Sequence, residues 1–184
     1  MGPRWLSFEQ ICNQWIEIHP SDEEWMRELP KSELVCLEIG AFIHATGTRD
    51  DPPWDYDATP RDSHTFASTG VDGEHFSVLF DASARGVVVL TAPMAFDRPN
   101  TVVGASLDDF LGLVAVGGFA VIPNVAYRGL ERGSADIASA PEPAANSLLH
   151  EIRTRLALTP WPNVERRLLE LQQRYAHLVH PRRA

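Results

Sequence analysis

The sequence has little of several features that mark particular classes of protein. Its 184 residues include only two cysteines, Cys12 and Cys36, with no CxxC spacing. We therefore expect buried thiols in a reducing compartment and no disulfide framework. The longest apolar runs, such as residues 111–122, are too short to span a bilayer, and residues 1–10 do not resemble a signal peptide. These absences predict a soluble, cytoplasmic protein.

Motifs typical of enzymes are also missing. No GxxxxGK[ST] or GxGxxG loop leads into a helix, which argues against a phosphate-binding loop. No GxSxG elbow surrounds Ser68 or Ser77. The best polar constellation has no HExxH or HxH spacing, although it could bind a metal or exchange protons; it comprises His64, Asp72, Glu74, His75 and Asp81. We interpret it as structural and predict no catalytic residue, no metal and no cofactor.

Charge of one sign dominates most of the chain. The net charge is −9, and the only lysine is Lys31. Residues 1–60 carry −8 and residues 61–147 carry −5, whereas residues 148–184 carry +4. An acidic body argues against binding to a phosphate backbone, so we predict no nucleic-acid partner. It suits a cationic protein partner, although acidity also serves solubility alone.

The expected secondary structure begins with helices. Apolar residues at helical spacing predict a helix that is capped by Ser7 and stopped by Pro20, and a shorter one that follows Ser21 and ends at Pro30. Residues 32–46 could be a helix or a buried strand, and their length favours a helix. Residues 48–63, with three prolines and five aspartates, predict a long loop.

The middle of the chain is rich in β-strand signals. Short strands are expected at residues 64–67, 75–80, 87–90 and 101–103, and their succession suggests an antiparallel meander. Ser106 caps an expected helix that ends at Gly117 and Gly118. Residues 119–122 could add a strand or an extended packing segment. The fold class expected is α+β, a mainly antiparallel twisted sheet flanked by N-terminal and C-terminal helices.

The C-terminal part is expected to be a linker and a helical hairpin. Residues 132–145, rich in Ser, Ala and Pro, predict the linker, and the expected division is 1–134 for the α+β domain and 135–184 for the appended segment. Asn146 or Ser147 can cap the first helix, and Pro162 suits the first position of the second. The second helix carries an apolar stripe of Val164, Leu168, Leu171, Tyr175 and Leu178. This stripe could pack on the domain or mediate a homodimer.

The loop at 48–63 holds the residues that we expect to bind a partner. Exposed Trp and Tyr often dominate protein interfaces, and acids around them would steer a basic partner. The candidate partner-binding residues are Trp54, Tyr56, Asp55, Asp57, Asp50 and Asp51. The alternative is that Trp54 enters the core and the acids are only solvated.

The stretch from His64 to Phe119 carries a recognisable order of motifs. The hairpin HTFASTGVDGEHF comes first, followed by a strand that ends in PMAF, a short VVG strand and the helix SLDDFL at residues 106–111. This order resembles the SUKH superfamily, the yeast cell-wall-regulator-like fold found in many bacterial toxin-immunity proteins. The residues after Ala144 lie outside the resemblance.

The resemblance implies a twisted antiparallel sheet flanked by helices and a binding role, often the neutralisation of a cognate toxin from the same bacterial strain. It supplies no shared catalytic residues. We therefore expect an immunity-type protein that covers the active site of a basic toxin domain. Two alternatives stay open: a self-assembling regulatory or scaffold protein, and a metal-assisted hydrolase using His64, His75 and Asp72.

Overall fold

Each strand of the sheet pairs with the strand that precedes it in the chain. In the computed structural model, which describes residues 3–18, 29–44, 56–79 and 86–179, the strand order is β1-β2-β3-β4-β5, antiparallel throughout. The strands are β1 (Phe42–Ile43), β2 (Ser63–Ser68), β3 (His75–Leu79), β4 (Val88–Thr91) and β5 (Asn100–Gly104). The expected meander is confirmed. Strand β1 was not anticipated as a separate element, and residues 119–122 form turns instead of a strand.

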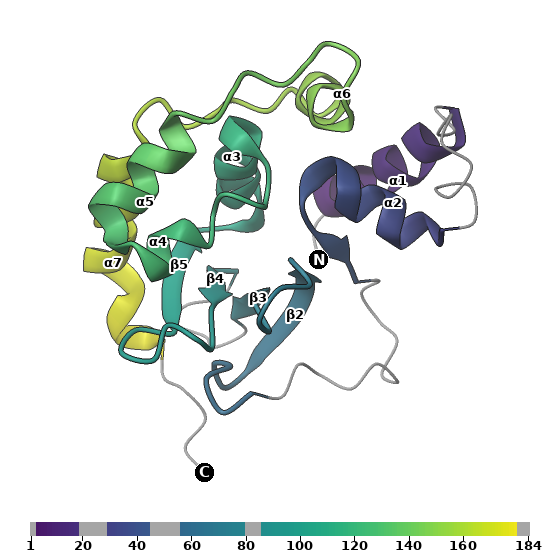
Figure 1. Ribbon diagram of the computed structural model, residues 1–184. Helices are drawn as coiled ribbons and strands as arrows, with labels where there is room; N and C mark the ends of the chain where they lie inside the picture. The colour runs from purple at the N-terminus through teal and green to yellow at the C-terminus, as the bar shows by residue number, and fades with distance from the viewer. Residues whose placement is uncertain (1–2, 19–28, 45–55, 80–85, 180–184) are drawn as a thin grey trace.

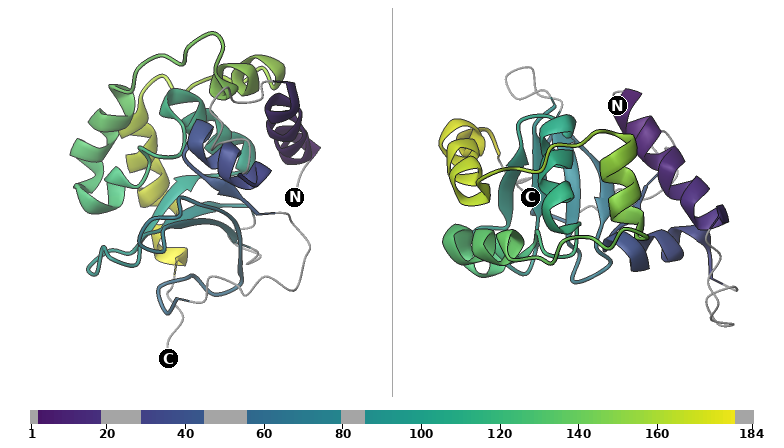
Figure 2. Two further views of the ribbon diagram at one scale, coloured as in Figure 1. Left: turned by 45° about the vertical axis from the view of Figure 1, so that its right-hand side comes forward. Right: turned by 90° about the horizontal axis from the view of Figure 1, so that it is seen from above.

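Helices flank this sheet and confirm the α+β class (Figure 1). They are α1 (Pro3–Ile18), α2 (Lys31–Ile39), α3 (Leu107–Gly117), α4 (Asn124–Tyr127), α5 (Gly129–Ala138), α6 (Leu148–Arg155) and α7 (Val164–Tyr175), followed by the 3₁₀ turn η2 (Ala176–Leu178). Seen from above, α5 and α7 lie at one end of the assembly and α1 and α2 at the other (Figure 2, right). None of the described helices combines the length and apolarity needed to cross a membrane.

Side-chain caps mark the start of α3, α6 and α7, and the structure departs from expectation at three places. The Ser106 hydroxyl accepts from the Asp109 N–H at 3.1 Å, as predicted for α3, and Ser147 caps α6 in the same way. Helix α1 begins at Pro3, so Ser7 lies inside the helix and does not cap it. Pro162 was expected at the first position of α7, but the helix begins at Val164, and Asn163 caps it by accepting from the Arg166 N–H at 2.9 Å.

The third departure concerns the expected linker at 132–145. Residues up to Ala138 belong to α5 because Gly133, Ser134 and Ile137 face the core and are buried. The segment was predicted to be a linker because the buried face of this helix consists largely of small residues, which are also typical of linkers. The short helix expected after Ser21 lies largely outside the described residues.

The core lies between the sheet and α3 and is organised by aromatic rings. Phe110 of α3 stands 5.3 Å from Phe76 of β3 and 5.6 Å from Phe119, measured between ring centroids. A bulge in β2 lets Phe66 join them, at 5.7 Å from Phe110. All four rings are fully buried. Tilted and edge-on packing of this kind adds to the burial of apolar area and fixes α3 on the sheet.

Helix α7 covers the outer edge of β5. The Gln172 side-chain amide donates to the Val102 carbonyl at 2.7 Å, and its oxygen accepts from the Val102 N–H at 3.3 Å. One side chain therefore takes the hydrogen bonds that a sixth strand would make to Val102. Unpaired strand edges promote aggregation, and this contact protects β5 from it.

The two C-terminal helices lie against different parts of the molecule (Figure 2). Helix α6 packs on α1 and α2, whereas α7 packs on β5 and α5. Three residues of the predicted apolar stripe of α7 are buried in the core of this chain: Val164, Leu168 and Leu171. The stripe is thus used for packing on the domain, which was one of the two expected uses. Self-assembly through these helices stays a prediction.

Candidate protein-binding surface

The sheet register separates the two histidines that a metal site would need. In the β2–β3 hairpin, His64 lies opposite Val78, whereas His75 lies opposite Ser68. Because side chains alternate between the faces of a sheet, positions 75 and 78 of β3 point to opposite sides. His64 and His75 therefore cannot share one metal ion. Among the described residues, no group of three or more His, Cys, Asp or Glu side chains is placed to hold a metal, and Asp81 lies outside them.

His75 has a structural environment. Its side chain is fully buried, its Nδ1 lies 2.8 Å from the Gly73 carbonyl oxygen, and its Nε2 lies 3.2 Å from the Thr59 hydroxyl. The carbonyl can only accept, so Nδ1 carries the proton and Nε2 accepts from Thr59. Burial lowers the pKa of His75 below its ordinary value, although the bond to Gly73 acts in the opposite direction. The neutral ring ties the turn before β3 to the segment at 56–60.

The described thiols lack the features of nucleophiles. Both cysteines are free. Burial, with a smaller contribution from Glu9, raises the pKa of Cys12 to about 12. Burial and the nearby Glu33 also raise the pKa of Cys36. Because the thiolate is the reactive form, neither thiol is activated. Cys12 lies in the core as expected, whereas the expectation of a buried thiol is wrong for Cys36, which is only partly buried.

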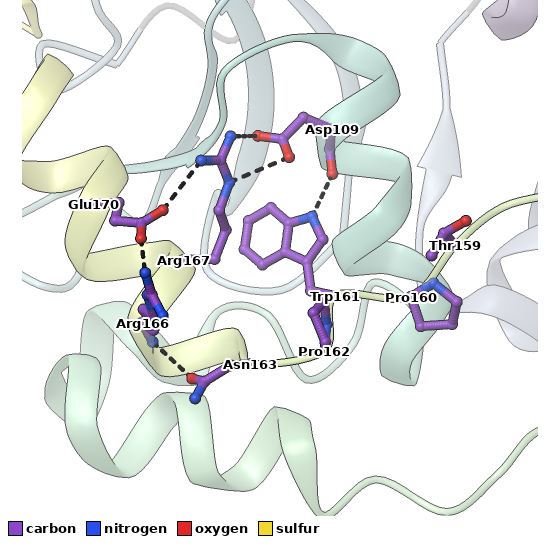
Figure 3. A pocket seen from close by; sticks show the side chains of 9 residues that line it. All are labelled: Asp109, Thr159, Pro160, Trp161, Pro162, Asn163, Arg166, Arg167 and Glu170. Carbon is purple, nitrogen blue, oxygen red and sulfur yellow. Dashed lines mark hydrogen bonds and ion pairs between the residues drawn. The ribbon is translucent and has the colours of Figure 1, made fainter.

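An open pocket of about 430 Å³ lies where α7 meets α3 (Figure 3). Trp161 forms one wall, and its indole N–H donates to the Asp109 carbonyl at 2.8 Å. Arg167 binds the Asp109 carboxylate with two hydrogen bonds, of 2.8 and 3.3 Å, and its guanidinium carbon lies 5.9 Å from the Trp161 ring centroid. Glu170 accepts from Arg166 at 3.0 Å and from Arg167 at 3.3 Å.

The charges around this pocket neutralise one another. Two arginines face two acids, and the hydrogen bond that Arg167 donates to Asp109 is the main cause that raises the pKa of Arg167. The hydrogen bond from Arg166 is the main cause that lowers the pKa of Glu170. Among the described residues that line the pocket there is no histidine, cysteine or serine. We interpret it as the joint that holds α7 and the segment before it against α3.

A different region carries exposed apolar side chains. Pairing of His75 with Thr91, and of Thr91 with Asn100, places the β2–β3 turn (69–74) and the β4–β5 loop (92–99) at the same end of the sheet. The segment 56–60 crosses this end: the Thr59 hydroxyl meets His75, and the Asn100 amide donates to the Ala58 carbonyl at 2.8 Å. From α4, Tyr127 comes close to this end: burial raises the pKa of Tyr127, and its interaction with Glu74 of the β2–β3 turn raises that pKa further.

These four segments present a set of apolar side chains that are 40 % to 79 % exposed. Phe96 is 79 % exposed and is the most exposed large apolar residue of the described chain. We define the sheet-end surface by the exposed side chains Tyr56, Val71, Met94, Phe96 and Tyr127. Single exposed apolar residues are ordinary, but a group gathered over adjacent loops is typical of an interaction site.

The sheet-end surface includes part of the predicted binding loop. Tyr56 and the exposed Asp57 lie on it, and Tyr56 stacks on His75 with ring centroids 6.1 Å apart. Trp54, Asp55, Asp50 and Asp51 lie outside the described residues.

Sequence reasoning missed Met94, Phe96, Val71 and Tyr127 as surface residues. The signal for Met94 and Phe96 was the segment PMAFDRP, in which two large apolar residues stand between prolines outside any strand period. The sequence alone did not show that the β2–β3 turn and the β4–β5 loop lie next to each other.

Comparison with protein-family models, with curated proteins and with solved structures finds no match to this chain. The resemblance of residues 64–119 to the SUKH superfamily therefore stays a prediction.

Proposed function

We propose that this chain is a non-enzymatic protein-binding domain whose partner binds across the sheet-end surface. The observation that carries the proposal is the gathering of exposed apolar side chains over three adjacent segments and α4. Aromatic and methionine side chains are enriched in protein interfaces, and few residues supply most of the binding energy. Phe96 and Met94, at the tip of the β4–β5 loop, are the natural anchors.

The charge of the same region favours a basic partner. The segments 56–60, 69–74 and 92–99 contain four acids against one base, Arg98, a net charge of −3. Acids beside an apolar centre accelerate association with a cationic protein and exclude acidic ones. The net charge of −9 for the whole chain acts in the same direction.

Within this function, the narrower proposal is an immunity-type protein that neutralises a basic toxin domain by covering its active site. Its support is the resemblance of residues 64–119 together with the acidic, apolar surface. A tight complex buries about 1,600 Å² in total. The predicted binding loop at 48–63 leads directly into the sheet-end surface through Tyr56, so both can belong to one interface.

Matched capture experiments test this function. The wild-type chain, a sheet-end variant (Met94→Ser with Phe96→Ser) and a control variant (Ile18→Ser with Leu169→Ser) are used as baits in lysate of the source organism. All four positions are exposed, so each variant is expected to fold. We expect one stoichiometric basic protein with the wild type and the control. Loss of Phe96 alone should weaken binding about 30-fold, because an anchor contributes about 2 kcal/mol.

The outcomes distinguish the proposed binding surface from the narrower proposal of a toxin as the partner. Equal recovery of the partner by the sheet-end variant would move the interface elsewhere. Recovery of the chain alone by every bait would favour the self-assembling alternative. If the partner is a toxin, the wild type and not the sheet-end variant should restore growth to cells that express it.

A further inference from the structure

The loop between β4 and β5 folds into two consecutive turns. The Ala95 N–H donates to the Ala92 carbonyl at 2.9 Å, and the Arg98 N–H donates to the Ala95 carbonyl at 3.0 Å. Pro93 is the second residue of the first turn, where its fixed φ favours this conformation. The Ala92 N–H donates to the Pro99 carbonyl at 2.7 Å and closes the loop at its base. These bonds hold the loop in one shape through its own backbone.

The base of this loop is fixed to the rest of the domain. Thr91 and Asn100 are paired residues at the ends of β4 and β5, and the Thr91 hydroxyl donates to the Asn100 side-chain oxygen at 2.8 Å. The Asn100 amide in turn donates to the Ala58 carbonyl at 2.8 Å. A flexible loop loses conformational entropy when it binds, whereas this loop has already lost that entropy on folding. It is therefore shaped for binding before a partner arrives.

The two turns present Phe96 in a way that the other aromatic residues of the sheet-end surface are not presented. Phe96 is the second residue of the second turn and is 79 % exposed, whereas Tyr56 and Tyr127 are 40 % and 42 % exposed. The Tyr56 ring also stacks on His75 of the same chain. A partner can therefore cover one side of a tyrosine ring, but it can enclose both faces of the Phe96 ring. Because the hydrophobic contribution grows with the apolar area removed from water, enclosure stabilises a complex more than contact on one face.

We propose that the β4–β5 loop is a preformed insertion element that places the Phe96 ring in an apolar cavity of the partner protein. This inference rests on the proposed protein-binding function and adds the kind of partner, a protein whose surface is concave at the contact. Asp97 and Arg98 follow Phe96 and are exposed, so they can stay hydrated at the mouth of the cavity, as charged residues do at the rim of an interface. The net charge of −3 on the three loop segments of this surface opposes an anionic lipid surface, which favours a protein cavity over a membrane.

A titration of the full chain with β-cyclodextrin, followed by amide NMR, tests whether the loop presents Phe96 to a cavity. β-Cyclodextrin is a soluble ring of glucose units whose apolar cavity accommodates a phenyl group, and maltoheptaose is the matched open chain without a cavity. We expect saturable shifts centred on residues 94–98 with β-cyclodextrin only. Phe96→Ser should abolish these shifts, whereas Leu169→Ser, at an exposed position of α7, should leave them unchanged. Absence of binding, or shifts centred on Tyr56 or Tyr127, would overturn the insertion element.

Backbone relaxation of the free chain tests whether the loop is preformed. We expect NMR order parameters of about 0.85 for the amides of residues 94–98, the value of rigid backbone, and values below about 0.6 would reject a preformed loop. Flotation with phosphatidylcholine vesicles tests the membrane as the alternative target. We expect no binding, and binding that is lost in Phe96→Ser would make the loop a membrane anchor and overturn the proposal.

The protein that the wild-type bait recovers in the capture experiment separates insertion from flat contact. A cavity that fits a phenyl ring is overfilled by a larger ring, so Phe96→Trp should weaken binding about tenfold. On a flat contact, the larger ring would keep or tighten binding, because it buries more apolar area. β-Cyclodextrin should also release this protein from the wild type, and maltoheptaose should not. A partner that is lost with the sheet-end variant but retained by Phe96→Trp would keep the proposed function and reject the insertion element.

Discussion

Replacing Gln172 by methionine removes both hydrogen bonds that α7 makes to the edge of β5 and keeps the length of the side chain. The amide of Gln172 donates to the Val102 carbonyl at 2.7 Å and accepts from its N–H at 3.3 Å. Val102 is 1 % exposed, so water does not readily replace these partners. The substitution therefore tests whether one side chain completes the sheet.

The expected loss follows from the two backbone groups left without a partner. A buried donor or acceptor without a hydrogen bond costs about 1–3 kcal/mol, and the longer bond to the N–H should lie at the lower end. Methionine recovers part of this by apolar packing. We expect the free energy of unfolding to fall by about 2 kcal/mol, which lowers Tm by about 4–8 °C for a chain of this size.

Urea unfolding, read by far-UV circular dichroism, measures this change. The matched control is Gln173→Met, because Gln173 is the next residue of α7 and is exposed. The control should remain within about 0.5 kcal/mol of wild type, as is usual for surface changes. If the two variants have the same stability, the Gln172 amide does not stabilise the edge of β5 and the reasoning fails.

Two further predictions concern the sheet-end surface. Because burial lowers the pKa of His75, the folded protein binds fewer protons there than the unfolded chain, and stability is lost as the pH falls below about 6.5. Urea unfolding at pH 7.5 and 5.0 should show a larger loss for wild type than for His75→Gln; identical losses would contradict the assignment. Gly73→Ala should cost about 1 kcal/mol more than Gly86→Ala, because both positions have positive φ but only Gly73 lies against Tyr56. Equal costs would show that Tyr56 moves aside freely.

Local patterns in the sequence were enough to predict the elements that depend on neighbouring residues. Ser106 and Ser147 cap helices through bonds to backbone groups three residues on, so their role can be read from the chain. The four longer strands follow from short apolar runs between turn residues. Where small residues form the buried face, as in α5, the same signals predicted a linker instead, because composition does not reveal what packs against Gly133 or Ser134.

The sheet-end surface was also predictable only in part from the sequence. Tyr56 and Asp57 were predicted from an aromatic residue among acids in a loop. Phe96, Met94 and Tyr127 were not, because their significance depends on three loop segments and α4 meeting at one end of the sheet. The sequence also could not exclude a metal site at His64 and His75, because only the register of β2 and β3 places these two side chains on opposite faces of the sheet.

The amino-acid sequence by itself determined the fold class, the meander of strands and the acidic charge, because each depends on local periodicity, on turn chemistry or on composition. The tertiary structure alone decided which exposed side chains are neighbours, which polar groups are satisfied and how α7 protects β5. These properties depend on contacts between residues far apart along the chain, such as Val102 with Gln172, and no local pattern encodes such distances.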